Sequence, residues 1–146
     1  SYGDVFMDIF SKEQRSKLMA SIGPKNTKLE EKVRKKLWAR GLRFRKNLNG
    51  LVGKPDIAIK KYKVVIFIDS CFWHGCEIHG QIPKSNVEFW TNKINKNKLR
   101  DVEVTNYYKE KNWNILRIWE HEINQNLDKT IDKIVDFISN LKNKSK

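Results

Sequence analysis

An unbroken run of apolar residues at positions 64–68, VVIFI, constrains the fold more than any other feature of the sequence. A half-buried strand alternates apolar and polar residues, whereas a continuous apolar run is typical of a strand covered on both faces. We expect a second strand at residues 57–60, joined to the apolar run by a short turn at Lys61 and Tyr62, and another strand at residues 113–120. The chain therefore needs helices on two faces of a sheet.

The first of these helices is predicted to start at residues 27–30, TKLE. This is the sequence of a capping box, in which the Thr27 side chain bonds to the backbone at Glu30 and Glu30 bonds back. Gly41 is a typical C-terminal stop, and we expect Trp38 to widen the apolar stripe into the core. The stripe recurs at four-residue spacing, at Leu29, Val33 and Leu37.

A second, longer helix is predicted for residues 86–111. One of its faces carries Trp90, Ile94, Asn97, Asp101, Thr105 and Tyr108. Because a buried polar group costs free energy unless it is bonded, each polar member of this face needs a partner or a task. A third amphipathic helix closes the chain around residues 131–141.

The predicted order is one helix, three strands (42–46, 57–60 and 63–69), a helix, a strand and a helix. This order indicates an α/β fold with a mixed sheet between helices. A chain of 146 residues with 39% hydrophobic composition fits a single domain, residues 1–146, in which we expect 1–11 and 142–146 to be mobile.

The composition favours a polyanionic partner. Thirty Lys and Arg residues against seventeen Asp and Glu give a net charge of +13, spread along the chain, which places nucleic acid first among possible partners. No stretch approaches the roughly 18 apolar residues of a membrane span, and no segment resembles a signal peptide. We therefore expect a cytoplasmic protein with no membrane association.

Both cysteines and two of the three histidines lie within residues 71–79. Cys71, Cys76 and His79 have the ligand types and spacing with which a loop can wrap a zinc ion, and His121, just past the strand 113–120, is the natural fourth ligand. Four protein ligands would make this a closed, structural site. The alternatives are a disulfide, or cysteines that serve only as small buried side chains.

A second candidate metal position is Asp56, in GKPDIAI, at the mouth of a strand after a tight turn. A carboxylate held there by rigid backbone suits Mg²⁺. A Pro-Asp pair before two apolar strands also occurs in PD-(D/E)xK nucleases, although it is common turn chemistry as well. The second acid of that motif would be Asp69, but Ser70 and Cys71 follow it where x-Lys is expected.

The ordered series RSKLMASI, TKLEEKV, GKPDIAI, VVIFIDSCFWHGC, EFWTNKINKNKLRD and NWNILRIWEHEI resembles the very short patch repair (Vsr) endonucleases. These mismatch nickases belong to the restriction-endonuclease-like superfamily, and the likeness spans residues 12–123. It implies a restriction-endonuclease-like mixed sheet flanked by helices, with one structural zinc site.

The resemblance also implies catalytic roles. Asp56 and the main-chain carbonyl of Ile68 would bind Mg²⁺, which removes the need for a second acid in the motif. His74 would be the general base for the attacking water, and Glu30 and Asp101 would support the hydrated metal or the histidine. The family's zinc ligands fall at Cys71, Cys76, near His79 and at His121.

For DNA binding the resemblance implies that three aromatic residues wedge into the duplex beside the mismatch: Phe72, Trp73 and Trp90. The alternative is that all three are core residues. We expect Lys93, Asn97 and Arg100 to approach the phosphates or the site. An N-terminal arm around Arg15, Lys17 and Met19 is a weaker expectation.

The predicted function is a Mg²⁺-dependent, zinc-stabilised monomeric endonuclease that nicks one strand of double-stranded DNA at a T:G mismatch, together with repair factors or an associated cytosine methyltransferase. Asp69 departs from the family, some members of which carry histidine there, so it is either a working acid or a sign of an altered substrate. Two alternatives stay open: a sequence-specific double-strand endonuclease of the same fold, and a non-catalytic zinc DNA-binding module.

Overall fold

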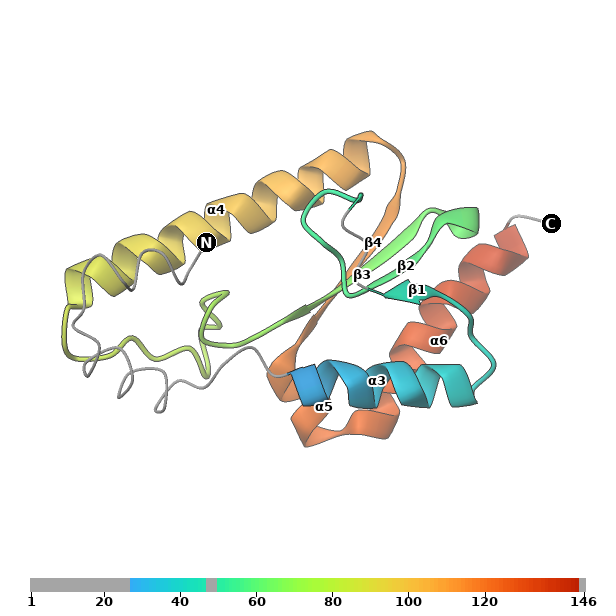
Figure 1. The fold of residues 1–146 in the computed structure, drawn as a ribbon, viewed down its shortest axis with the longest axis horizontal. Coiled ribbons are helices and arrows are strands. Elements are labelled where there is room, and N and C mark those ends of the chain that lie inside the picture. Colours follow the sequence, from blue (N-terminus) through green and yellow to red (C-terminus); the bar gives the residue numbers. More distant parts are fainter. Residues whose placement is uncertain (1–26, 47–49, 145–146) are drawn as a thin grey trace.

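The structure is a computed structural model that describes residues 27–46 and 50–144 (Figure 1). Its helices are α3 (Thr27–Ala39), α4 (Val87–Glu110), α5 (Glu120–Gln125) and α6 (Leu127–Lys144). Its strands are β1 (Arg45–Lys46), β2 (Ile57–Ile59), β3 (Val64–Asp69) and β4 (Asn114–Trp119), with a short 3₁₀ turn, η1 (Lys60–Tyr62), between β2 and β3.

The four strands form one mixed sheet in the order β1-β2-β3-β4. β1, β2 and β3 pair antiparallel, whereas β3 and β4 pair parallel from Val64 with Asn114 to Asp69 with Trp119. A parallel pair needs a crossover connection, and α4 provides it. The prediction of a mixed α/β sheet between helices is therefore confirmed.

All six residues of β3 are buried, as the unbroken apolar run predicted. Val64, Ile66 and Ile68 belong to a core that α3 and α6 complete, whereas Val65 and Phe67 belong to a second core closed by Val104 and Tyr108 of α4. Figure 1 shows this layering, with α4 across one side of the sheet and α3, α5 and α6 on the other. β3 therefore ends between two packed layers.

The end of α3 has the backbone bonds of a Schellman motif. The N–H of Leu42 donates to the carbonyl of Leu37, and the N–H of Gly41 donates to the carbonyl of Trp38, with Gly41 at φ +88°. The predicted glycine stop is confirmed. The Thr27 side chain lies outside the described residues, so its capping role stays a prediction.

The prediction that Trp38 belongs to the core is wrong, because its side chain is 49% exposed. It follows Leu37 by one residue, which turns it about 100° away from the buried stripe. Its ring instead lies under the guanidinium of Arg43, 3.9 Å from the ring centroid, and meets Phe44 edge-on. Trp113 packs partly buried against the α4 side.

Smaller departures from the predicted elements have local causes. The predicted strand 42–46 is reduced to β1, and the predicted closing helix is α6, which is preceded by a short helix, α5, that the sequence did not predict. Asn126 Oδ1 accepts the N–H of Lys129, as an N-cap does, so α6 starts afresh after α5. α6 continues to Lys144, three residues into the segment 142–146 expected to be mobile. Residues 1–11 lie outside the described part.

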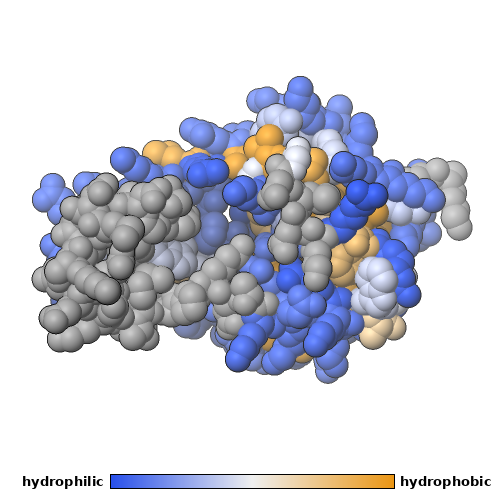
Figure 2. Space-filling model, viewed as in Figure 1, coloured by the Kyte–Doolittle hydropathy of each residue, from blue (hydrophilic) through white to orange (hydrophobic). Residues whose placement is uncertain are grey.

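Hydrophilic residues cover most of the described surface in the view of Figure 2, with a band of hydrophobic residues along the edge where α4 lies in Figure 1. The exposed apolar side chains of α4 include Val87, Leu99 and Val102. No helix within the described residues is long and apolar enough to span a bilayer.

Candidate active site and metal-binding loop

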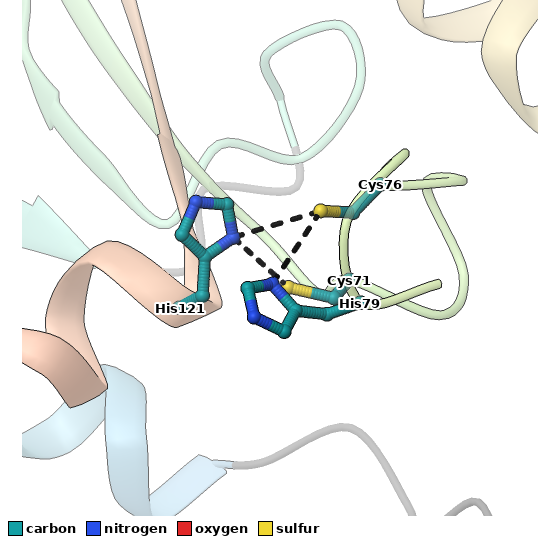
Figure 3. A group of neighbouring side chains, drawn as sticks. All are labelled: Cys71, Cys76, His79 and His121. Atoms are coloured by element: carbon teal, nitrogen blue, oxygen red, sulfur yellow. Dashed lines mark hydrogen bonds between the residues drawn. The ribbon is translucent and has the colours of Figure 1, made fainter. Parts of the chain in front are cut away.

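The four residues predicted from the sequence as metal ligands lie close together, three on the loop after β3 and one on α5. Cys71, Cys76, His79 and His121 each offer one ligand atom, and these atoms all lie within 4.8 Å of one another. Figure 3 shows Cys71, Cys76 and His79 on the loop and His121 on α5, with their sulfur and nitrogen atoms turned toward one another. Neither cysteine forms a disulfide.

The spacing within this Cys/His cluster fits a tetrahedral ion. His121 Nδ1 lies 3.4 Å from Cys71 Sγ and 3.6 Å from Cys76 Sγ, and His79 Nδ1 lies 3.9 Å from Cys76 Sγ. A zinc ion about 2.3 Å from sulfur and about 2.0 Å from nitrogen would hold each such pair about 3.5 Å apart. The cluster could therefore hold one ion with little movement.

Backbone bonds and one glycine shape the loop around the cluster. The N–H of Cys76 donates to the Cys71 carbonyl, and the N–H of Gly80 donates to the Cys76 carbonyl, both at 2.8 Å. A Cβ at Gly80 would lie 2.5 Å from the Cys71 oxygen and 2.6 Å from the Cys76 oxygen. Only glycine fits there without opening the loop.

A hydrogen bond from Cys71 also connects the loop to α5. Its N–H donates to Glu120 Oε1 at 3.2 Å. Burial raises the pKa of the Cys71 thiol to about 11, with Cys76 and Glu120 adding to the rise against a hydrogen bond from His121. Because zinc binds thiolate, a bound ion would reverse this preference and release the proton.

His74 lies on the same loop, against α4. Its Nδ1 is 2.6 Å from Asp101 Oδ2 and 3.7 Å from Asp69 Oδ1. Nε2 has no hydrogen-bond partner in the described part of the chain. When Nδ1 carries the proton and donates it to Asp101, Nε2 is left as a proton acceptor. The predicted base and one predicted acid therefore form a hydrogen-bonded pair.

Asp69, the residue that departs from the expected motif, is 4% exposed and paired with a cation. Arg117 Nη1 donates to both Asp69 oxygens, at 3.0 and 3.2 Å. Burial raises the pKa of the Asp69 carboxyl, and nearby Asp101 adds to this, whereas His74 and Arg117 oppose it.

Arg117 was not found from the sequence, which places it inside an apolar strand. The sequence did contain one indication of its role, because Arg117 is a lone arginine among the apolar residues of its strand. In the structure the neighbouring strand, β3, ends in the buried Asp69. A buried cation requires an anionic partner.

Asp56 lies where β2 begins, beside the end of β3. Its Oδ2 accepts the N–H of Ile68 at 2.7 Å, and its own N–H donates to the Ile66 carbonyl. The side chain is 3% exposed. The structure thus brings together the two residues expected to bind Mg²⁺. Both offer hard oxygen ligands, and one carboxylate with waters and substrate phosphate is an ordinary Mg²⁺ set.

Glu30 lies on α3 and is buried, with Arg34 Nη1 4.0 Å from its Oε2. Arg34 also donates to Glu31 at 2.9 Å. α3 packs on the face of the sheet opposite to α4, so Glu30 and Asp101 belong to different layers.

The predicted DNA-wedging residues form a compact cluster. Phe72 meets Trp73 and Trp90 edge-on, with centroids 5.0 and 5.3 Å apart. Trp73 and Trp90 are buried, and Phe72 is partly exposed. Asn97 is also buried and donates from Nδ2 to the Trp73 carbonyl at 2.8 Å, so this residue holds the aromatic loop against α4.

Two predicted phosphate-contacting residues lie on α4. Arg100 is exposed and Lys93 is partly buried. Burial lowers the pKa of the Lys93 ammonium, and the neighbouring charges of Lys96 and Arg100 lower it further. Mutually repelling cations on one helix are relieved when an anion binds between them. The predicted N-terminal arm, Arg15, Lys17 and Met19, lies outside the described residues.

Comparison with known proteins gives a consistent result. The sequence model of the family described as "DNA mismatch endonuclease Vsr" matches residues 7–79. A "Type II nicking enzyme V.NmeDIP" of Neisseria meningitidis serogroup C is 43% identical over 130 residues, 88% of each chain. A "Type II nicking enzyme V.HpaIIP" of Haemophilus parainfluenzae is 44% identical over 126 residues, 84% of this chain and 89% of the relative.

A third relative, "DNA mismatch endonuclease Vsr" of Escherichia coli strain K12, is 36% identical over 115 residues, 77% of this chain and 73% of the relative. With the α/β sheet and its acid–histidine pair, these likenesses define the class: the protein is a DNA endonuclease, a hydrolase of phosphodiester bonds. Within that class the chain belongs to the Vsr family of DNA mismatch endonucleases.

Proposed function

We propose that this endonuclease requires Mg²⁺ and nicks one strand of duplex DNA at a T:G mismatch, as in very short patch repair. The observation that carries the proposal is the 2.6 Å contact between His74 Nδ1 and Asp101, which leaves Nε2, on the loop after β3, without a hydrogen-bond partner among the described residues. A restriction-endonuclease-like core is consistent with the mixed sheet, the Asp56 position and the parallel β3–β4 pair.

His74 is the general base of the proposed reaction. Nε2 accepts the proton of the attacking water while Asp101 holds the ring and stabilises the imidazolium that forms. Asp69 adds negative charge 3.7 Å from Nδ1, which favours the same charged form of the ring.

Asp56 and the Ile68 carbonyl are the proposed ligands of Mg²⁺, with Glu30 acting through waters. When bound, Mg²⁺ polarises the phosphate and carries water that can protonate the leaving oxygen. The Ile68 N–H fixes the direction of the Asp56 carboxylate through Oδ2. A carboxylate held by rigid backbone in this way needs little reorganisation on binding.

The Cys/His cluster is the proposed zinc site. With four protein ligands and no open position, zinc there would be structural. It would fix residues 71–79 between β3 and α5, and so fix His74 against α4. Loss of zinc should abolish activity indirectly, by releasing His74 from Asp101.

The aromatic cluster is the proposed wedge. Phe72, the partly exposed ring, is best placed to enter first, while Trp73 and Trp90 support it and require the loop to open before they reach bases. Unstacking costs a few kcal/mol and stacking each base on an aromatic ring returns about 1–3 kcal/mol. A mismatched step costs less to open, which favours T:G sites.

Single-strand nicking is favoured over double-strand cleavage because two of the three relatives described above are called nicking enzymes. The acid–histidine pair argues against a non-catalytic zinc module. The net charge of +13 and the cations on α4 support duplex DNA as the partner.

Strand-resolved cleavage tests the proposal. Duplexes with each strand separately end-labelled, one matched and one containing a single T:G pair, are incubated with the protein and Mg²⁺. We expect a nick in one strand of the mismatched duplex alone. Cleavage of both strands in matched DNA would replace the proposal with a double-strand endonuclease, and binding without cleavage would replace it with a DNA-binding module.

A further inference from the structure

Arg117 projects from β4 toward α4 and uses its whole guanidinium group. Nε donates to Thr105 Oγ1 at 2.9 Å, Nη1 donates to both oxygens of Asp69, and Nη2 donates to the main-chain carbonyl of Asp101 at 3.2 Å. The guanidinium carbon also lies 4.5 Å from the centroid of the Phe67 ring. One side chain thus joins β3, β4 and α4.

These contacts converge on the surroundings of His74. The ring nitrogen Nδ1 faces Asp101 at 2.6 Å and Asp69 at 3.7 Å, and Arg117 contacts both of these residues. Arg117 Nη1 also lies 3.9 Å from Asp101 Oδ1. The two acids beside the histidine are therefore held by a common cation.

The position of Arg117 also accounts for the missing lysine of the PD-(D/E)xK pattern. That lysine would follow Asp69 by two residues, at a position occupied by Cys71. The parallel register pairs Phe67 with Arg117 and Asp69 with Trp119, so Arg117 lies one strand away from Asp69. The cation beside the acid thus comes from the neighbouring strand, and position 71 is free to serve the Cys/His cluster.

We propose that Arg117 is a positioning residue of this endonuclease, which fixes Asp69 and Asp101 around His74 and so aims Nε2 of the histidine ring. The proposal rests on the proposed function, in which His74 acts on water. Arg117 acts through the acids, and nothing requires it to touch DNA. A lysine could not replace it, because one ammonium group cannot reach Thr105, Asp69 and the Asp101 carbonyl together.

The first test compares Arg117→Met and Arg117→Lys with the wild type in single-turnover nicking of the T:G duplex, well below each melting temperature. We expect DNA affinity close to that of the wild type and a nicking rate lower by about 10²-fold, since a small misplacement of a reacting group can cost that much. Lysine should not restore the rate. Wild-type rates in both folded variants would overturn the proposal.

A structural role alone would also lower stability, so the second readout is the ring of His74 itself. The chain has three histidines, which makes long-range ¹H–¹⁵N correlation spectra simple to assign. We expect the Nδ1–H signal of His74 to move or broaden in Arg117→Met. It should persist in Val104→Ala, a control that weakens the same hydrophobic core and leaves the four side chains Arg117, Thr105, Asp69 and Asp101 in place. Unchanged His74 signals in Arg117→Met would contradict the proposal.

Thr105→Val keeps the test valid if Arg117→Met fails to fold, because it removes one acceptor of Arg117 without leaving a buried charge. We expect a several-fold lower nicking rate and a shifted His74 signal. If both the rate and the signal stay unchanged, the positioning role of Arg117 is refuted.

His74→Ala separates the proposed role of His74 as general base from the proposed role of Arg117. If His74→Ala nicks as the wild type does, the general-base assignment fails, while the effect of Arg117 on the His74 ring is still decided by the spectra.

Discussion

His74 Nδ1 and Asp101 Oδ2 lie 2.6 Å apart, although 27 residues separate them in the sequence. This contact joins the loop after β3 to the middle of α4, and Asn97, one turn earlier on α4, holds the same loop through the Trp73 carbonyl. Orientation of the histidine therefore depends on the packing of a helix that contacts both this loop and the sheet.

Asp101→Asn should lower the single-turnover nicking rate by about 10²–10⁴-fold, because the amide no longer stabilises the imidazolium formed when His74 takes a proton. DNA affinity, measured by fluorescence anisotropy, should stay close to that of the wild type. The matched control is Glu103→Gln, which removes one acid from the exposed face of α4 and should leave the rate unchanged. Equal rates in Asp101→Asn and wild type would rule out the role of the pair.

Removing zinc should abolish nicking and lower the melting temperature. Elemental analysis of the purified protein should find one zinc ion per chain, and Cys76→Ser should lose it, since a thiolate ligand is replaced by a hydroxyl. His74→Ala should keep its zinc, because His74 lies outside the Cys/His cluster. Fully active protein that contains no zinc would refute the assignment.

Gly80→Ala should weaken metal binding and destabilise the loop, because its Cβ would meet two main-chain oxygens of the cluster. Overpacking of this kind costs about 1–3 kcal/mol. Gly50→Ala is the matched control, since nothing lies within 4 Å of a Cβ there. Competition with a zinc-binding dye measures the effect, and equal zinc affinity in the two variants would show that the loop does not close as described.

Leu37→Ala and Trp38→Ala should differ sharply despite their adjacency. Leu37 is fully buried, so its truncation should cost about 2–5 kcal/mol of unfolding free energy. Trp38 is half exposed, so Trp38→Ala should lower the unfolding free energy by about 1 kcal/mol or less, mainly through the lost contact with Arg43. Urea denaturation compares them, and a larger loss for Trp38 would mean that an interface covers this ring.

Sequence patterns gave a sound account of the features that local chemistry controls. The continuous run 64–68 indicated a strand covered on two faces, and Gly41 marked the end of α3. On α4, the rule that buried polar groups need partners was confirmed for Asn97, Asp101 and Thr105, which bond to Trp73, His74 and Arg117. Ligand spacing found the whole Cys/His cluster.

Features that depend on tertiary packing were missed. The partners of Arg117 come from β3 and α4, and no spacing within residues 113–120 indicates which neighbour a strand will have. Trp38 was placed in the core because hydrophobicity alone cannot tell a buried ring from one that covers an arginine on the surface. α5 was missed as well, because its six residues are too few to show a helical apolar pattern.

The most direct test of the catalytic account is single-turnover nicking of a T:G duplex by Asp56→Asn beside the wild type, with Mg²⁺ and with EDTA. The wild type should nick only with Mg²⁺, and Asp56→Asn should bind the duplex with unchanged affinity, retain its zinc and fail to nick under either condition. Wild-type nicking by Asp56→Asn, or undiminished nicking by the wild type in EDTA, would contradict the account.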